Sequence, residues 1–281
     1  METLVATDGG TIRYRQMGSG RPIVLLHGLM AHGGFFSGQL PLADSHRLIA
    51  VDFRGHGEAR RERRNVTVER LARDVTELSD ALDLRQAIVI GWSLGATVLW
   101  HVLTGPASQR FDGAVVIDMT PRVMNGPGWA LGLTRERCDD RLRAIQDDYP
   151  AFARMAGEAI FAPDFAGAQH LKGWAGEEFA GNDAASMAML WTSLAEQDLR
   201  PQLCSIGQPA IIVHGGQSHL YGPDTARYLV NAMPDAHAVE FPECGHSPHL
   251  EAPDAFNALV HQFEAGLTPF KTNKKIETGE R

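Results

Sequence analysis

The sequence has little cysteine, with three residues in a chain of 281. Cys138, Cys204 and Cys244 are widely spaced and odd in number, and no C-x-x-C spacing occurs. This arrangement excludes the usual cysteine patterns of zinc sites and of dithiol redox sites.

Long apolar runs are also missing. No stretch approaches the ~18 consecutive apolar residues that a membrane span needs. Residues 1–17 mix charges, Gly and Thr without the apolar core of a signal peptide. Together with the cysteine usage, these absences predict a cytoplasmic protein that has no membrane partner.

Positive charge is scarce, because 26 Lys and Arg face 34 Asp and Glu, which gives a formal net charge of -8. One basic cluster stands out, and we interpret it as a solvated loop. It consists of Arg60, Arg61, Arg63 and Arg64. A nucleic-acid-binding protein would show a positive balance and a basic stripe, so we expect no nucleic-acid partner.

The sequence does contain an alternation of apolar runs with helical segments. Strand-like runs occur at 22–28, 47–52, 88–90, 113–118, 209–215 and 236–241. Helical segments are expected at 67–84, 97–103, 223–232 and 253–263. This alternation predicts an α/β fold with a mostly parallel sheet and helices on both faces. Residues 4–6 and 11–16, around a Gly-rich turn, predict an antiparallel hairpin at the edge of the sheet.

The predicted sheet is interrupted once. Residues 121–202 are rich in Ala, Met and Trp, have helical periodicity in places and contain no convincing strand. We predict an all-helical cap over the C-terminal edge of the sheet, where ligands bind in such folds. The core then comprises residues 1–120 and 203–268, and residues 269–281 form a flexible tail. Candidates for an apolar substrate pocket are Met30, Trp92, Trp129 and Trp191.

The clearest chemistry lies between residues 88 and 96. A β-branched strand ends in Gly91-Trp92-Ser93-Leu94-Gly95, and an apolar helical segment follows. This pattern predicts a tight strand-to-helix turn that exposes the Ser93 hydroxyl in a strained conformation. Gly91 and Gly95 avoid clashes across the turn. Because a serine hydroxyl is a weak nucleophile by itself, the interpretation needs a histidine base, an acid and an oxyanion hole.

Two further segments supply the base and the oxyanion hole. His246 lies in the loop after the last predicted strand. In a parallel sheet that loop stands at the same edge as Ser93, so we expect His246 to be the base. His27-Gly28-Leu29 ends a buried strand in a Gly-rich turn. We expect the amides of Leu29 and Leu94 to form the oxyanion hole.

With these residues assigned, the chain resembles the α/β-hydrolase fold superfamily of serine hydrolases. Four segments carry the resemblance in the superfamily's order: 27–29, 52–57, 91–95 and 245–248, the last leading to 251–253. The resemblance covers almost all of the chain except the cap and the tail. It implies that His27, Asp52 and His56 shape the turn beneath the site. A serine at position 93 argues against dehalogenases and epoxide hydrolases, which need an aspartate there.

The acid departs from the superfamily's pattern. In similar proteins the acid lies about three residues after the strand that ends at Gly215 in this chain. Here that place is taken by Ser218. A serine cannot carry the negative charge that stabilises an imidazolium. We prefer Asp118 as the replacement, because an unpaired carboxylate at the edge of a buried sheet is costly unless a group such as His246 binds it. Asp118 could instead anchor the start of the cap. Asp224 is a second candidate, although it resembles a favourable charge in the first turn of a helix.

These residues predict hydrolysis of a small to medium, largely apolar, uncharged ester or lactone through an acyl-enzyme, with Ser93, His246 and Asp118 as the triad. No metal or organic cofactor is needed, and neither H-x-H-x-D-H nor H-E-x-x-H occurs. C–C bond hydrolases and perhydrolases share this triad and stay open as alternatives. A ligand-binding or signalling protein with weak hydrolysis also stays open as an alternative, because Ser218 occupies the usual position of the acid. A contact between Asp118 and His246 would favour the enzyme. No stripe of residues specifies an oligomeric state.

Overall fold

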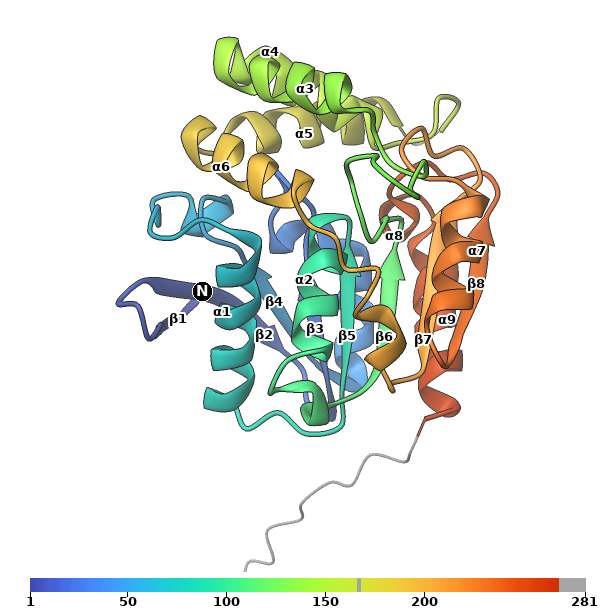
Figure 1. The fold of residues 1–281 in the computed structure, drawn as a ribbon. Helices are drawn as coiled ribbons and strands as arrows, with labels where there is room; N and C mark the ends of the chain where they lie inside the picture. Colours follow the sequence, from blue (N-terminus) through green and yellow to red (C-terminus); the bar gives the residue numbers. More distant parts are fainter. Residues whose placement is uncertain (166–167, 268–281) are drawn as a thin grey trace, which may run out of the picture.

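Eight strands form one sheet in the computed structural model, which describes residues 1–165 and 168–267. The predicted tail over 269–281 lies outside these residues. Across the sheet the strands follow the order β1-β2-β4-β3-β5-β6-β7-β8 (Figure 1). Their bounds are Glu2–Val5 (β1), Thr11–Met17 (β2), Arg21–Leu26 (β3), His46–Asp52 (β4), Ala87–Trp92 (β5), Phe111–Ile117 (β6), Ala210–Gly215 (β7) and Ala236–Phe241 (β8).

The first two strands form the predicted hairpin at one edge of the sheet. β1 pairs antiparallel with β2, and β2 pairs antiparallel with β4. The remaining neighbouring pairs are parallel. The predicted α/β fold with a mostly parallel sheet is therefore confirmed. Because these parallel strands share one direction, the loops after β3, β5, β6, β7 and β8 meet at the same edge.

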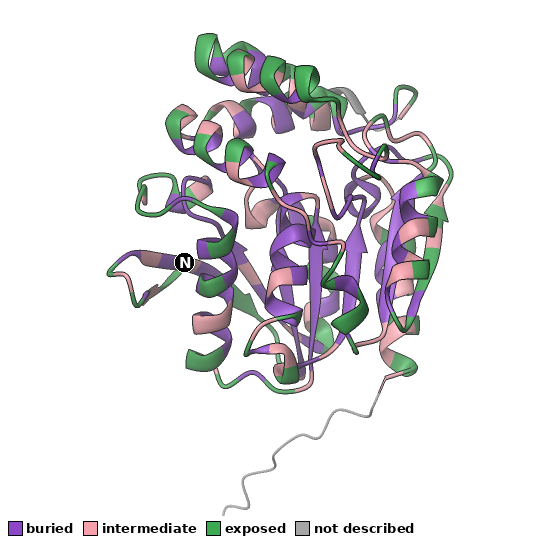
Figure 2. Cartoon of the chain, viewed as in Figure 1, coloured by how far each residue is buried: buried purple, intermediate pink, exposed green. Residues whose placement is uncertain are grey.

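Helices cover both faces of the sheet. Their bounds are Val68–Ala81 (α1), Leu94–Leu103 (α2), Pro223–Ala232 (α7), Pro248–Glu251 (α8) and Pro253–Ala265 (α9). Short 3-10 segments span Gly33–Asp44 (η1), Gly57–Ala59 (η2), Ser108–Arg110 (η3) and Leu203–Ser205 (η4). α1 and α2 pack together on one face, and η1 packs with α9 on the other. All residues of β3, β5 and β7 are consequently buried, as Figure 2 shows for the centre of the sheet.

Four more helices are inserted between β6 and β7: Arg135–Asp147 (α3), Tyr149–Ala159 (α4), Ala168–Ala180 (α5) and Ala184–Ala195 (α6). They lie above the C-terminal edge of the sheet at the top of Figure 1, and we propose that they form the cap. α4 and α5 approach closely, because a Cβ on Gly157 would lie 2.5 Å from the amide nitrogen of Gly176. Among the described helices, none combines the length and the hydropathy that crossing a bilayer requires.

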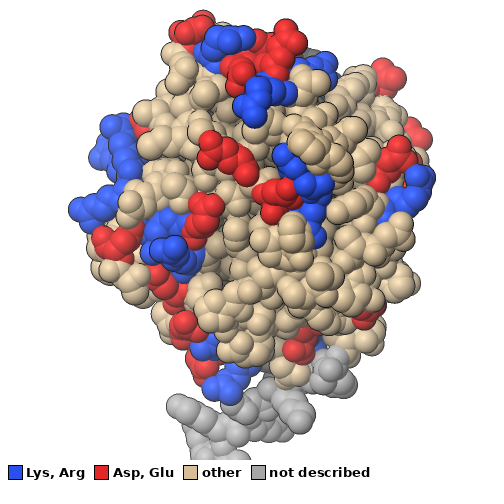
Figure 3. Space-filling view, viewed as in Figure 1, with Lys and Arg blue, Asp and Glu red and all other residues tan. Residues whose placement is uncertain are grey.

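Charges of both signs share the face of the molecule that Figure 3 draws. On the face drawn in Figure 3, Lys and Arg side chains are interspersed with Asp and Glu. All four arginines of the basic cluster at 60–64 are exposed, and Arg63 pairs with Asp183 at 2.6 Å. This agrees with the interpretation of the cluster as a solvated loop.

Candidate active site

Ser93 stands in a sharp turn between β5 and α2. Its backbone has φ 53° and ψ -120°, a combination that L-residues rarely adopt. A Cβ on Gly91 would lie 2.5 Å from the carbonyl oxygen of Gly95. A Cβ on Gly95 would lie 2.0 Å from the carbonyl oxygen of Leu26. The turn therefore needs both glycines, for the steric reason that the sequence pattern predicts.

Asp118 contacts His246. Nδ1 of His246 donates a hydrogen bond of 2.6 Å to Oδ2 of Asp118, whose side chain is 0% exposed. A carboxylate only accepts, so this bond places the imidazole proton on Nδ1 and leaves the Nε2 lone pair available. Asp118 follows the last residue of β6 and has φ 45°, so its backbone is also strained. The structure thus brings together the two residues that the sequence analysis paired.

Ser218 also binds the Asp118 carboxylate. Its hydroxyl donates a hydrogen bond of 2.6 Å to Oδ2 of Asp118 and accepts one from the Leu220 amide at 3.3 Å. Asp224, the alternative acid, lies in the first turn of α7, where its side chain is 67% exposed and accepts a bond from Arg227. The structure therefore brings Asp118, and not Asp224, to the histidine.

The two amides expected to form the oxyanion hole lie in the turn after β3 and at the start of α2. Within residues 1–165 and 168–267, neither the Leu29 nor the Leu94 amide donates a hydrogen bond. The Nδ1 of His27 donates to the Gly28 carbonyl at 2.8 Å, and its Nε2 accepts the Phe53 amide at 3.0 Å. Burial lowers the pKa of His27 to about 3, so the ring stays neutral and keeps both bonds. These contacts fix the turn that carries the Leu29 amide.

The loop that carries His246 is tied to three other segments. Trp92 in β5 donates its indole N–H to the His246 carbonyl at 2.8 Å. The carboxylate of Glu251 accepts the amides of Gly245 and Ala162, each at 2.8 Å, and so joins the loop to the segment after α4. At Gly215 a Cβ would lie 1.9 Å from the Gly245 carbonyl oxygen, so the end of β7 is in close contact with the loop. The position of His246 is thus fixed from the sheet and from the cap.

Ser93 and His246 line one cavity of about 120 Å³ between the sheet and the cap helices. Its walls are mostly apolar and include Leu29, Met30, Trp92, Phe152, Ile160 and Trp191. Three of the four predicted pocket residues are therefore at the wall. Trp129 is not, which corrects that prediction. Its indole N–H donates to the Arg122 carbonyl, and its ring packs 4.8 Å from the Tyr228 ring, because the segment before α3 folds against α7.

Comparison with known proteins agrees with this architecture. A model of the Alpha/beta hydrolase family matches residues 23–259. The chain belongs to this family. Among relatives of this α/β hydrolase, a pimeloyl-[acyl-carrier protein] methyl ester esterase of Nitrosospira multiformis is 29% identical over 260 residues, or 88% of this chain and 95% of the relative.

Two solved structures resemble this α/β hydrolase over nearly its whole length. An esterase from Exiguobacterium antarcticum has a TM-score of 0.86 at 23% identity, covering 94% of this chain and 99% of that chain. The enol-lactonase from Burkholderia xenovorans has a TM-score of 0.83 at 23% identity, covering 94% of this chain and 100% of that chain. At these identities the likeness shows the shared fold.

Three polar residues of this α/β hydrolase's site escaped the sequence analysis. Ser218 stands where a carboxylate is expected, and its position after β7 is the signal for a contact with the acid. Asn182 donates its side-chain N–H to the Met30 carbonyl and so ties the cap to the turn after β3. Arg141 lines the cavity, but α3 is so rich in charge that its sequence resembles a surface helix.

Proposed function

We propose that this α/β hydrolase cleaves carboxylic esters or lactones by a Ser93–His246–Asp118 triad through an acyl-enzyme. The observation that carries the proposal is the 2.6 Å hydrogen bond from His246 to the buried Asp118 carboxylate, beside a cavity that Ser93 also lines. A carboxylate in this place orients the imidazole and stabilises the imidazolium that forms during acyl transfer.

The reaction follows from the groups present. Ser93 Oγ attacks the substrate carbonyl while Nε2 of His246 takes the hydroxyl proton. The amides of Leu29 and Leu94, which lack other acceptors among the described residues, hold the oxyanion. His246 then gives the proton to the leaving alcohol, and a water molecule, activated by the same histidine, releases the acid.

The substrate class follows from the cavity. Its volume of about 120 Å³ and its mostly apolar walls favour a small, largely apolar acyl group. The relatives support this class, because those named above are a methyl ester esterase, an esterase and an enol-lactonase. The binding-protein alternative rested on a missing acid, and the contact of Asp118 with His246 argues against it. No observation favours a C–C hydrolase or a perhydrolase over an ester hydrolase.

The test is hydrolysis of p-nitrophenyl esters of increasing acyl length. We expect Ser93→Ala to abolish turnover, and Asp118→Asn to lower kcat by roughly 10³- to 10⁴-fold, because the histidine loses its orienting charge. Asp224→Asn is the matched control, since this carboxylate is exposed and pairs with Arg227, and it should retain full activity. Wild-type rates on esters and lactones that equal those of Ser93→Ala would refute the proposal.

A further inference from the structure

Arg141 is a cation in the wall of this cavity, and no described residue serves as its counterion. It projects from α3 of the cap into the same cavity as Ser93 and His246. Its guanidinium forms no ion pair or hydrogen bond with any residue that the structure describes. The contrast on the same helix is Arg143, which is exposed and pairs with Asp140. The N–H donors of Arg141 therefore have no protein acceptor within the described chain.

The surroundings hold this guanidinium in place. Its central carbon lies 4.7 Å from the centre of the Trp191 ring, which is within the range of a cation–π contact. Burial lowers the pKa of Arg141 from its ordinary value, yet an arginine in a protein stays charged. A partly buried charge without a partner is unfavourable, and an anion in the cavity would relieve that cost.

A second donor lies in the same wall. The buried Tyr221 lines the cavity, and its hydroxyl makes no hydrogen bond to another described residue. Burial raises the pKa of Tyr221, so the phenol keeps its proton and can donate. Apart from the proposed catalytic groups and the exposed His219, the described residues thus offer this cavity one guanidinium and one hydroxyl in a mostly apolar wall.

We propose that Arg141 binds a carboxylate on the acyl part of the substrate, so that the preferred substrate is an acidic half-ester or lactone of a small dicarboxylic acid. This inference rests on the proposed function, and it replaces the uncharged acyl group expected from the sequence by one that ends in a carboxylate. A planar guanidinium matches a carboxylate through two parallel hydrogen bonds. The carbonyl to be attacked would then lie at the Ser93 end and the charge at the cap end.

A matched pair of esters tests the proposal: monomethyl glutarate, which has a free carboxylate, and methyl pentanoate, which replaces that group by a methyl. We expect the wild type to prefer monomethyl glutarate. Arg141→Gln should lower kcat/KM for it by about 10- to 100-fold, mainly through KM, and change methyl pentanoate by less than about threefold. Arg141→Lys should restore part of the loss, and Arg143→Gln, on the same helix, should have no effect.

A turnover-free measurement separates this inference from the proposed function. Calorimetry should detect binding of monomethyl glutarate to the Ser93→Ala protein. The double variant Ser93→Ala/Arg141→Gln should bind this ester more weakly, by a factor similar to the loss in kcat/KM. Ser93-dependent hydrolysis without a preference for the charged ester would overturn the role of Arg141 and leave the proposed function standing. An equal loss on both esters would mean that Arg141 only supports packing on Trp191, which also overturns it. If neither esters nor lactones are hydrolysed, the proposed function fails, and the calorimetric comparison still decides whether Arg141 binds the carboxylate.

Discussion

Oδ2 of Asp118 accepts two hydrogen bonds of 2.6 Å, one from His246 Nδ1 and one from Ser218 Oγ. Its Oδ1 is buried and has no partner among the described residues. The serine stands 100 residues from the aspartate in sequence, so the bond is made by the meeting of β6 and β7 at one edge. We infer that Ser218 is a positioning residue, which holds the carboxylate oxygen toward the imidazole.

This role predicts a loss of activity in Ser218→Ala. The carboxylate would keep a single donor on Oδ2, and we expect kcat on a p-nitrophenyl ester to fall about tenfold, because a hydrogen bond to a charged group is lost. KM should stay nearly constant, since Ser218 acts through Asp118. Ser218→Thr, which retains the hydroxyl, should recover most of the rate. Equal kcat values for the alanine and threonine variants would show that the hydroxyl does not position the acid.

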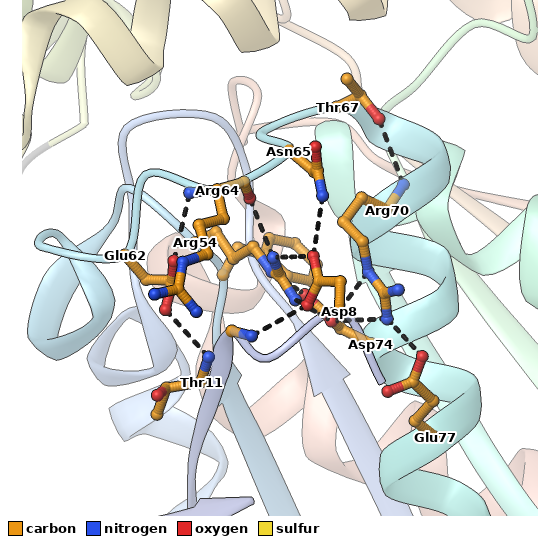
Figure 4. Close-up of polar contacts among 12 residues, drawn as sticks. Asp8, Thr11, Arg54, Glu62, Arg64, Asn65, Thr67, Arg70, Asp74 and Glu77 are labelled. Atoms are coloured by element: carbon orange, nitrogen blue, oxygen red, sulfur yellow. Dashed lines mark hydrogen bonds and ion pairs between the residues drawn. The ribbon is translucent and has the colours of Figure 1, made fainter. Parts of the chain in front are cut away.

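At the scale of elements, a polar cluster around Arg54 joins the β1–β2 turn, the loop after β4 and α1 (Figure 4). Arg54, in the loop after β4, donates to both carboxylate oxygens of Asp8 in the β1–β2 turn, at 2.7 and 2.9 Å. It also donates to both oxygens of Asp74 on α1, at 2.6 and 2.8 Å. Arg54 is 1% exposed. The cluster therefore fixes the hairpin, the loop beneath the proposed site and a flanking helix relative to one another.

Lysine cannot replace this arginine, because an ammonium has three donors and no planar fork. We expect Arg54→Lys to lower the free energy of unfolding by about 3 kcal/mol, since it leaves the buried Asp74 carboxylate and the partly buried Asp8 carboxylate incompletely paired. Urea denaturation followed by circular dichroism measures the change. Arg85→Lys is the control, because this arginine is 72% exposed and pairs with an exposed Asp83, and it should change stability by less than about 0.5 kcal/mol. A similar small change in both variants would contradict the structural role of the cluster.

The elements that could be predicted well from the sequence are those whose bounds are marked by local sequence signals. α7 and β8 have the expected bounds, because Pro223 starts the helix and an apolar alternation defines the strand. The turn at Ser93 could be predicted because its glycines and its strand are contiguous. Trp129 and Arg141 could not be placed, because their positions depend on how the segment after β6 folds onto the core. That docking is long-range, and composition alone does not specify which side chain faces a cavity.

At the scale of the whole molecule, burial keeps several histidines uncharged. It lowers the pKa of His27 and of His249 to about 3, and it lowers the pKa of His56 well below its ordinary value. In the unfolded chain each histidine has a pKa near 6.5. As pH falls below about 6.5 the unfolded state therefore binds protons that the folded state does not, so stability is lost downward from that pH until the folded pKa is reached. Each such histidine contributes at most about 1.4 kcal/mol per pH unit.

His249 is the member of this group that can be tested without disturbing a hydrogen bond. Neither of its ring nitrogens has a partner among the described residues, and its ring packs 4.9 Å from both Trp92 and Phe36. We expect His249→Phe to keep or raise stability at pH 8, because a buried unpaired polar group is removed. Between pH 6.5 and pH 4 the free energy of unfolding should fall by up to about 3 kcal/mol less in the variant than in the wild type. Urea unfolding at several pH values measures both slopes, with His237→Gln, whose imidazole is 84% exposed, as the control. Parallel slopes for His249→Phe and the wild type would mean that His249 takes up its proton in the folded state as readily as in the unfolded chain, and that burial does not govern the acid sensitivity of this protein.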